Sequence, residues 1–204
     1  QHANGAVPTT APEYVVFEGS GMDAFAESPE WGCTFVVLPF MYYETYGDDS
    51  LIRKYYNGMR RYIDYMTTRA NDGIVSFGLG DWYDYGDFRA GFSRNTPVPL
   101  VATAHYYMVV RYLVEAARML DNRYDVAYYT HLGEEINKAF HREFYHKDTR
   151  QYGTGSQCSN ALPLFLGMVP ADDRQAVLDN LVADIKRLGN RLTTGDVGNR
   201  YLFQ

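Results

Sequence analysis

The densest group of chemically active side chains is a short acidic and aromatic run, GLGDWYDYGD, at residues 78–87. Within it, residues 81–87 hold three aspartates and three aromatic side chains, without a Lys or Arg. An aromatic ring can pack on the apolar C–H face of a pyranose, and a carboxylate accepts hydrogen bonds from sugar hydroxyls. The pattern predicts a sugar-binding loop, with Asp81, Trp82 and Tyr83 as candidate substrate-binding residues.

A second acidic and aromatic patch, ESPEWG at residues 27–32, precedes a long apolar segment. Glu30 and Trp31 are its candidate substrate-binding residues by the same reasoning. Either tryptophan would be an ordinary core residue if judged by itself, whereas two tryptophans in acidic surroundings favour a sugar site. We expect the two patches to line one funnel, because loops that enter alternate helices of a ring of hairpins gather at one end.

Metal and cofactor sites are less well supported by the sequence. Asp81, Asp84 and Asp87 offer hard oxygen ligands for calcium, but their spacing does not match an EF-hand, which needs Asp at alternate positions and a closing Glu. Cys33 and Cys158 have no His or Cys at ligand spacing, so zinc is not expected. We therefore predict neither a metal nor a cofactor.

The candidate residues lie on loops between helical segments. Residues 1–30 show no helical period. Residues 71–95 form a long connector between helices, and loops of this length usually have a function. Gly47 marks a helix end and Thr96-Pro97 a helix start. His105 lies among apolar neighbours and is predicted to pack. The predicted helices cover residues 31–46, 51–69, 96–120, 124–145, 157–166 and 172–188.

The periodicity of the apolar residues indicates an all-α protein. Apolar side chains in the second predicted helix recur at steps of three and four residues, from Leu51 through Tyr55 and Tyr62 to Met66, which makes one apolar face. Short turns join the helices and predict antiparallel αα-hairpins. A faint internal repeat has an offset of 73 residues. Because its spacing is too irregular for a solenoid, we predict part of a closed (α/α)6 toroid.

Composition and charge narrow the function classes. The 204 residues are 46% hydrophobic, but no apolar run approaches the ~18 residues that a membrane span needs. The net charge of −6 and the pI of about 5.3 argue against nucleic-acid binding. Tyrosine occurs 19 times. Tyrosines at helical spacing are expected to pack between helices, whereas those beside the acidic loops belong to the sugar hypothesis.

The order of several short motifs resembles the catalytic domain of bacterial α-L-rhamnosidases. PEWG at residues 29–32, LPF at 38–40 and YGD at 46–48 come first, followed by GLGDW at 78–82. NTP at 95–97, QCSNALPL at 157–164 and LTTGDVG at 192–198 continue the same order. Each motif is short, but together they cover nearly the whole chain in sequence, which makes the resemblance fairly specific.

This resemblance implies part of an (α/α)6 toroid that hydrolyses terminal α-L-rhamnose with inversion. Trp31 and Trp82 match tryptophans that line the rhamnose pocket in the family, and Asp81 belongs to the same motif as Trp82. The implied partner is a rhamnose-containing glycan or glycoside.

The sequence departs from the family pattern at the reacting carboxyl groups. The family's proton donor is a Glu in an Asp-Glu-x-x-Gly-Trp segment upstream of the matched region, and no Asp-Glu dipeptide occurs in these residues. The family's general base is a Glu downstream of the matched region. We therefore expect residues 1–204 to be a partial catalytic domain, incomplete at both ends, with the remaining parts of that domain as its partners. By itself, such a chain should be inactive.

Two other functions fit the same residues. A different helical-toroid glycosidase could act by itself, with Glu30 or Glu27 paired with Asp81 or Asp196 as acid and base. A carbohydrate-binding helical module would use the aromatic groove without hydrolysis. Turnover by the isolated chain would favour the first of these, and sugar binding without hydrolysis would favour the second.

Overall fold

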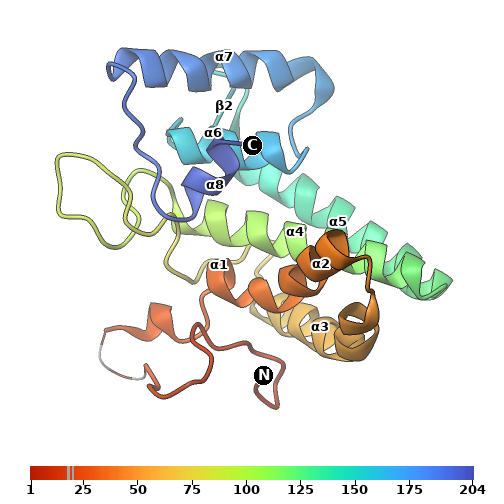
Figure 1. Ribbon diagram of the computed structural model, residues 1–204. Helices are drawn as coiled ribbons and strands as arrows, with labels where there is room; N and C mark the ends of the chain where they lie inside the picture. The colour runs from red at the N-terminus through yellow and green to blue at the C-terminus, as the bar shows by residue number, and fades with distance from the viewer. Residues whose placement is uncertain (18, 20) are drawn as a thin grey trace.

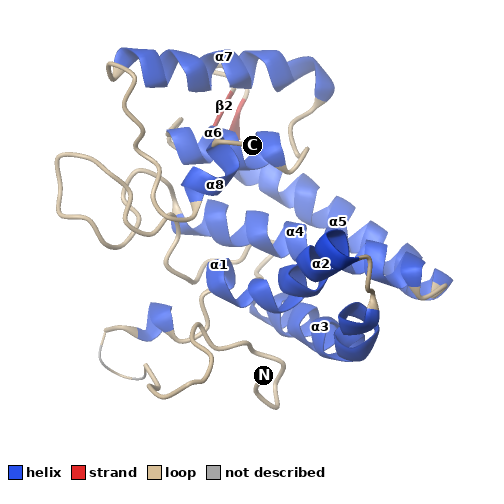
Figure 2. Cartoon of the chain, viewed as in Figure 1, coloured by secondary structure: helices blue, strands red, loops and turns tan. Residues whose placement is uncertain are grey.

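The computed structural model describes residues 1–17, 19 and 21–204, and most of the chain is helical (Figures 1 and 2). Two short strands, β1 (Tyr145–His146) and β2 (Gln151–Tyr152), pair antiparallel. The helices are the 3-10 helix η1 (Asp23–Phe25) and the α-helices α1 (Pro29–Gly32), α2 (Thr34–Tyr46), α3 (Ser50–Arg69), α4 (Val98–Met119), α5 (Arg123–Phe144), α6 (Gln157–Phe165), α7 (Ala171–Arg187) and α8 (Gly198–Leu202).

Consecutive helices pack as hairpins, α2 against α3, α4 against α5 and α6 against α7. In addition, α2, α4, α6 and α8 contact one another in succession, so alternate helices of the chain form one continuous row. The loops that precede α1, α4 and α8 lie on the same side of the molecule, at the left in Figure 1. This is the arrangement expected for part of a ring of helical hairpins, and it gathers the two predicted sugar-binding loops.

Local capping explains several helix boundaries. Gly47 ends α2 in the left-handed conformation, with its N–H donating to the Tyr43 carbonyl. The Asn122 side chain caps α5 by accepting a hydrogen bond from the N–H of Asp125. Ser156 caps α6 in the same way. The predicted helices beginning near residues 51, 124, 157 and 172 start within one residue of their observed positions, and those near 124 and 157 have these side-chain caps.

The first predicted helix, residues 31–46, differs from the structure. It begins two residues earlier, at Pro29, and its hydrogen-bond pattern is interrupted at Cys33, which separates α1 from α2. Cys33 keeps a right-handed helical conformation, and its N–H still donates to the Pro29 carbonyl. Pro39 lies inside α2 without ending it. The helical segment η1 and the small hairpin of β1 and β2 were not predicted, because two or three residues are too few to show a period.

The buried face of α3 is also shifted from the predicted stripe. Tyr55 is 38% exposed, whereas its neighbour Tyr56 is 7% exposed and donates a hydrogen bond from its hydroxyl to Asp125 on α5, at 2.7 Å. Tyr62 and Met66 are buried as expected. The predicted burial of Tyr55 was therefore wrong, because a buried carboxylate partner favours Tyr56 at the inner position. The Tyr55 ring still packs against Phe35 of α2, at 6.0 Å between ring centroids.

The core lies along α4, whose side chains are buried on several faces at once. Val101, Ala104, Val109 and Leu113 are fully or almost fully buried there. In the part of the chain that the structure describes, no helix has the length and apolar character to cross a membrane.

Candidate functional site

Three segments meet at the side of the molecule where α1, α4 and α8 begin. The N–H of Gly80 donates to the Glu30 carboxylate at 2.9 Å, which joins the two acidic and aromatic patches. The N–H of Asp196 donates to the Trp82 carbonyl at 2.8 Å, and the N–H of Tyr85 donates to the Thr193 carbonyl at 3.1 Å. The two patches therefore lie side by side, and the segment of residues 193–198 completes the cluster.

A pocket of about 360 Å³ opens between α1 and α2, the middle of α4, and α8. Glu30 and Trp31 line it, whereas Asp81, Trp82 and Tyr83 are not among its lining residues. The other lining residues are Cys33, Thr34, Val37, Leu38, Met41, His105, Met108, Asp196, Val197, Arg200 and Tyr201. The pocket is walled by α2, α4 and α8, which are alternate helices of the chain and would line the inside of a closed ring of hairpins.

The carboxyl group of Glu30 is buried and accepts hydrogen bonds from two other residues of the chain. Ser28 donates a hydrogen bond from its hydroxyl to Glu30 Oε2, and the N–H of Gly80 donates to Oε1. Burial raises the pKa of Glu30 from 4.5 to about 7, and these hydrogen bonds partly oppose that shift. Glu30 therefore combines a place in the pocket wall with a pKa near neutrality.

The two tryptophans are both partly buried but have different surroundings. Trp31 lies on α1 and forms part of the pocket wall. Trp82 belongs to an aromatic cluster, with edge contacts to Phe25 at 4.9 Å and to Phe92 at 5.4 Å between ring centroids. Phe25 comes from η1, so this cluster joins the N-terminal segment to the connector between α3 and α4. The aromatic neighbours thus hold the Trp82 ring in place between η1 and this connector.

Tyr83 is the exposed member of the predicted loop. Its side chain is 46% exposed, and its ring centroid lies 5.2 Å from that of Trp82. Its φ of 64° is in the left-handed region, and its N–H donates to the Gly91 carbonyl at 2.8 Å. Left-handed backbone is costly for a residue with a bulky side chain and is often kept at functional sites.

Asp81 is fully buried and connects two loops. Its carboxylate accepts hydrogen bonds from the N–H groups of Gly195, at 2.9 Å, and Gly198, at 2.7 Å. Burial raises the pKa of Asp81, and the two backbone donors oppose the shift. A Cβ on Gly195 would lie 2.2 Å from the Trp82 carbonyl oxygen, so only glycine allows this approach. Asp81 thereby holds the start of α8 against the Trp82 loop.

The other two loop aspartates have different environments. Asp84 is buried, and its Oδ2 accepts hydrogen bonds from the N–H groups of Arg94 and Asn95 at 2.8 and 2.6 Å, which closes the loop on itself. Asp87 is exposed. Across residues 1–17, 19 and 21–204, no group of three or more His, Cys, Asp or Glu side chains is arranged to hold a metal ion.

His105 and Tyr201, which both line the pocket, join α4 to α8. His105 is 2% exposed, and burial lowers its pKa to about 4, so the ring is neutral near pH 7. Its Nδ1 lies 2.8 Å from the Val101 carbonyl and its Nε2 lies 3.0 Å from the Tyr201 hydroxyl. A neutral ring satisfies both contacts by donating to Val101 and accepting from Tyr201. The expected packing role of His105 agrees with this burial.

Sequence reasoning missed the contribution of α8 to the pocket. Arg200 and Tyr201 line it, yet neither stands in an acidic or aromatic cluster in the sequence. No local signal in the sequence showed it, because the N–H groups of Gly195 and Gly198 bind Asp81, which lies more than a hundred residues earlier in the chain.

Comparison with known proteins gives the family. The family model of the bacterial alpha-L-rhamnosidase six-hairpin glycosidase domain matches residues 1–204. The chain is 29% identical over 184 residues to an alpha-L-rhamnosidase of Formosa agariphila, a match that covers 85% of this chain and 19% of that protein. It is also 29% identical over 175 residues to an alpha-L-rhamnosidase of Streptomyces avermitilis, covering 85% of this chain and 16% of that protein.

Solved structures show the same fold. The alpha-L-rhamnosidase of Dictyoglumus thermophilum has a TM-score of 0.87 and 30% identity, over all of this chain and 22% of the other. The Streptomyces avermitilis enzyme in complex with L-rhamnose has a TM-score of 0.85 and 26% identity, over all of this chain and 18% of the other. The chain thus spans about a fifth of the length of these relatives. Its helical hairpins are part of an all-α toroid, and the chain belongs to the bacterial alpha-L-rhamnosidase six-hairpin glycosidase domain family.

Proposed function

We propose that this chain forms one wall of the sugar pocket of an α-L-rhamnosidase that removes terminal α-L-rhamnose from glycans or glycosides with inversion. The observation that carries this proposal is the pocket between α1, α4 and α8, in which Glu30 and Trp31 line the wall next to the loop of Trp82. An aromatic wall with few, fixed polar groups is the usual construction of a site for a small ligand.

The predicted site residues take different parts in this proposal. Trp31 offers an aromatic face to the sugar inside the pocket, and Trp82 and Tyr83 extend that aromatic surface along the adjacent loop. Asp81 is buried against two N–H groups, so it contributes by holding the loops around the sugar. Glu30 lines the pocket while its oxygens accept hydrogen bonds from Ser28 and Gly80.

The acid and the base of the reaction are proposed to lie outside residues 1–204, in the remaining parts of the same domain. Inverting hydrolysis needs two carboxyl groups, about 6.5–9.5 Å apart, with a water molecule between them. The isolated chain is therefore expected to be inactive, and the rest of the domain is its required partner.

The direct test uses the full-length protein and a panel of aryl glycosides. We expect hydrolysis of the α-L-rhamnoside, and proton NMR during the first minutes should show β-L-rhamnose as the initial product. Hydrolysis of another aryl glycoside with no action on the α-L-rhamnoside would exclude the proposed substrate. Initial release of α-L-rhamnose would exclude inversion.

A second candidate function is a glycosidase whose acid and base both lie within this chain. It is favoured by one observation, that Glu30 and Asp196 line the same pocket and Glu30 has a pKa raised to about 7. Glu27, by contrast, faces Tyr65 and Arg69 on α3, and Asp81 is buried. Turnover of an aryl glycoside by the purified 204-residue chain, abolished by Glu30→Gln, would support this alternative.

A further inference from the structure

Ser28 and Glu30 bind the backbone of the loop that leads to Trp82. The N–H of Gly80 donates to Glu30 Oε1 at 2.9 Å, and the N–H of Leu79 donates to Ser28 Oγ at 3.1 Å. The Ser28 hydroxyl in turn donates to Glu30 Oε2. We call this set of two side chains and two backbone N–H groups the loop clamp.

The loop clamp is buried and closely fitted. Ser28 is 0% exposed, Leu79 1% and Glu30 7%. At Gly78, whose φ is 125°, a Cβ would lie 2.6 Å from Glu30 Oε2, so the loop backbone passes directly against the carboxylate. Burying a carboxyl group costs free energy unless it is hydrogen-bonded. The position of Glu30 is therefore best explained by the backbone that it holds.

The loop clamp connects the two tryptophans through very short stretches of chain. Trp31 follows Glu30 directly, and Trp82 is two residues after Gly80. A movement of the loop away from Glu30 would carry Trp82 away from Trp31.

We propose that the Ser28–Glu30 pair is a positioning device that sets Trp82 at the correct distance from Trp31 for one sugar ring. In this role Glu30 acts through Trp82 and transfers no proton. The inference rests on the proposed function, because it assumes that the two tryptophans bind the same sugar.

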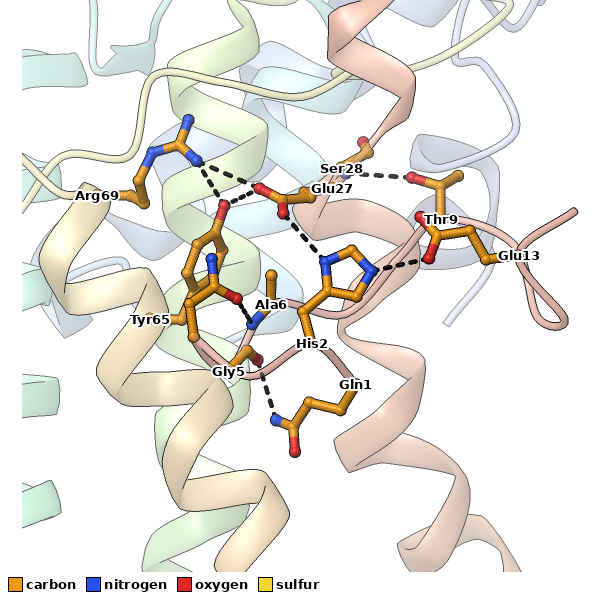
Figure 3. A network of polar contacts seen from close by, with 11 residues as sticks. Gln1, His2, Gly5, Ala6, Thr9, Glu13, Glu27, Ser28, Tyr65 and Arg69 are labelled. Carbon is orange, nitrogen blue, oxygen red and sulfur yellow. Dashed lines mark hydrogen bonds and ion pairs between the residues drawn. The ribbon is translucent and has the colours of Figure 1, made fainter. Parts of the chain in front are cut away.

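A matched control lies in the same segment. The Glu27 side chain points toward α3, where its carboxylate accepts hydrogen bonds from Tyr65 and, at 3.3 Å, from Arg69 (Figure 3). His2 Nδ1 lies 3.6 Å from the same carboxylate, and His2 Nε2 lies 2.7 Å from Glu13, so this network also holds the N-terminal segment. Glu27→Ala therefore removes a partly buried carboxylate of the same segment without removing an atom of the loop clamp.

The test is a double-mutant cycle in the full-length protein, measured on an aryl α-L-rhamnoside. Glu30→Ala is expected to lower kcat/KM by about 10- to 100-fold, mainly through KM, because small displacements of a positioned group are costly. In the Trp82→Ala background the same change should cost less than about 3-fold, because residues that act as one unit are not additive. Glu30→Gln keeps an oxygen for the Gly80 N–H and should stay within about 5-fold of the wild type.

Hydrogen exchange supplies a readout that does not depend on activity. Glu30→Ala should speed exchange at the amides of residues 79 and 80, whereas Glu27→Ala should leave them unchanged and keep kcat/KM within about 2-fold. Unchanged exchange at these amides in Glu30→Ala would overturn the inference.

Two kinetic outcomes would also contradict it. The first is an equal loss from Glu30→Ala with and without Trp82. The second is a fall in kcat of about 10³-fold or more in Glu30→Gln at unchanged KM, which is the signature of a proton-transferring group. If the wild-type protein does not act on α-L-rhamnosides, the proposed function fails by itself, and hydrogen exchange still decides whether the loop clamp exists.

Discussion

At the scale of single residues, the buried carboxylates of the two acidic loops accept hydrogen bonds from groups of the chain itself. Asp81, Asp84 and Glu30 each accept hydrogen bonds from backbone N–H groups, whereas Trp31 lines the pocket and the ring of Tyr83 is exposed. Buried carboxylates that hold backbone in place are a common way to make loops rigid enough for ligand binding. The acidic composition of these loops therefore serves loop geometry first.

Glu30 gives a stability prediction with a definite sign. Its pKa is 4.5 in a model peptide and about 7 in the folded chain, so the folded state binds this proton more tightly. The free energy of unfolding should therefore decrease as pH rises through this window, by about 3 kcal/mol in total. Denaturant titrations of the full-length protein at pH 5 and pH 8 should show most of this decrease, and Glu30→Gln should abolish it. Glu27→Gln, which leaves Glu30 intact, should keep the wild-type difference.

The sequence predicted which residues lie close together, but not the hydrogen-bond donors that their carboxylates bind. Trp31, Glu30 and the loop of Trp82 could be placed together, because loops before alternate helices share one end of a ring of hairpins. The hydrogen bonds that the Asp81 carboxylate accepts could not be predicted. Their donors, the N–H groups of Gly195 and Gly198, lie more than a hundred residues further along the chain.

At the scale of secondary structure elements, helix positions were predictable and helix faces were less so. The start of α5 follows from local signals at Asn122, which act within a few residues. The choice of Tyr56 over Tyr55 for the interior depends instead on Asp125 in another helix. Long-range partners of this kind leave no periodic signal in the segment itself.

A substitution at Gly195 tests the contact between the segment before α8 and the Trp82 loop. Gly195→Ala would place a Cβ 2.2 Å from the Trp82 carbonyl oxygen, so the segment of residues 193–198 must move. We expect a loss of at least about 2 kcal/mol in unfolding free energy and a lower kcat/KM in the full-length protein. Gly133→Ala in α5 is the matched control, because its nearest neighbour would be at 3.6 Å. It should be neutral or stabilising by up to about 1 kcal/mol; equal losses at both positions would contradict the assignment.

At the scale of the whole molecule, several helices expose apolar side chains. Leu178 and Val182 on α7 are 40% and 39% exposed, and Phe203 beyond α8 is 74% exposed. Leu178 also lines a shallow pocket with Phe165 and Leu202. An exposed apolar patch usually marks an interface. In a ring of hairpins, this face is where the next hairpin would pack.

Leu178 therefore provides a prediction about the full-length protein. If the following hairpin covers α7, Leu178→Ser should lower the unfolding free energy by about 2 kcal/mol, because apolar burial is lost. Lys138→Ser on α5, at a site 69% exposed, should change it by less than about 0.5 kcal/mol. Denaturant titration of both variants measures the difference, and a neutral Leu178→Ser would show that this face stays open to solvent.

The most direct measurement of the central assignment is steady-state hydrolysis of an aryl α-L-rhamnoside by full-length Trp31→Ala, Trp31→Phe and Trp82→Ala variants. If these side chains form the aromatic wall of the rhamnose pocket, each Ala variant should lose at least about tenfold in kcat/KM, and Trp31→Phe should recover part of the loss because it keeps an aromatic face. Full kcat/KM in both folded Ala variants would contradict the assignment of this pocket to rhamnose.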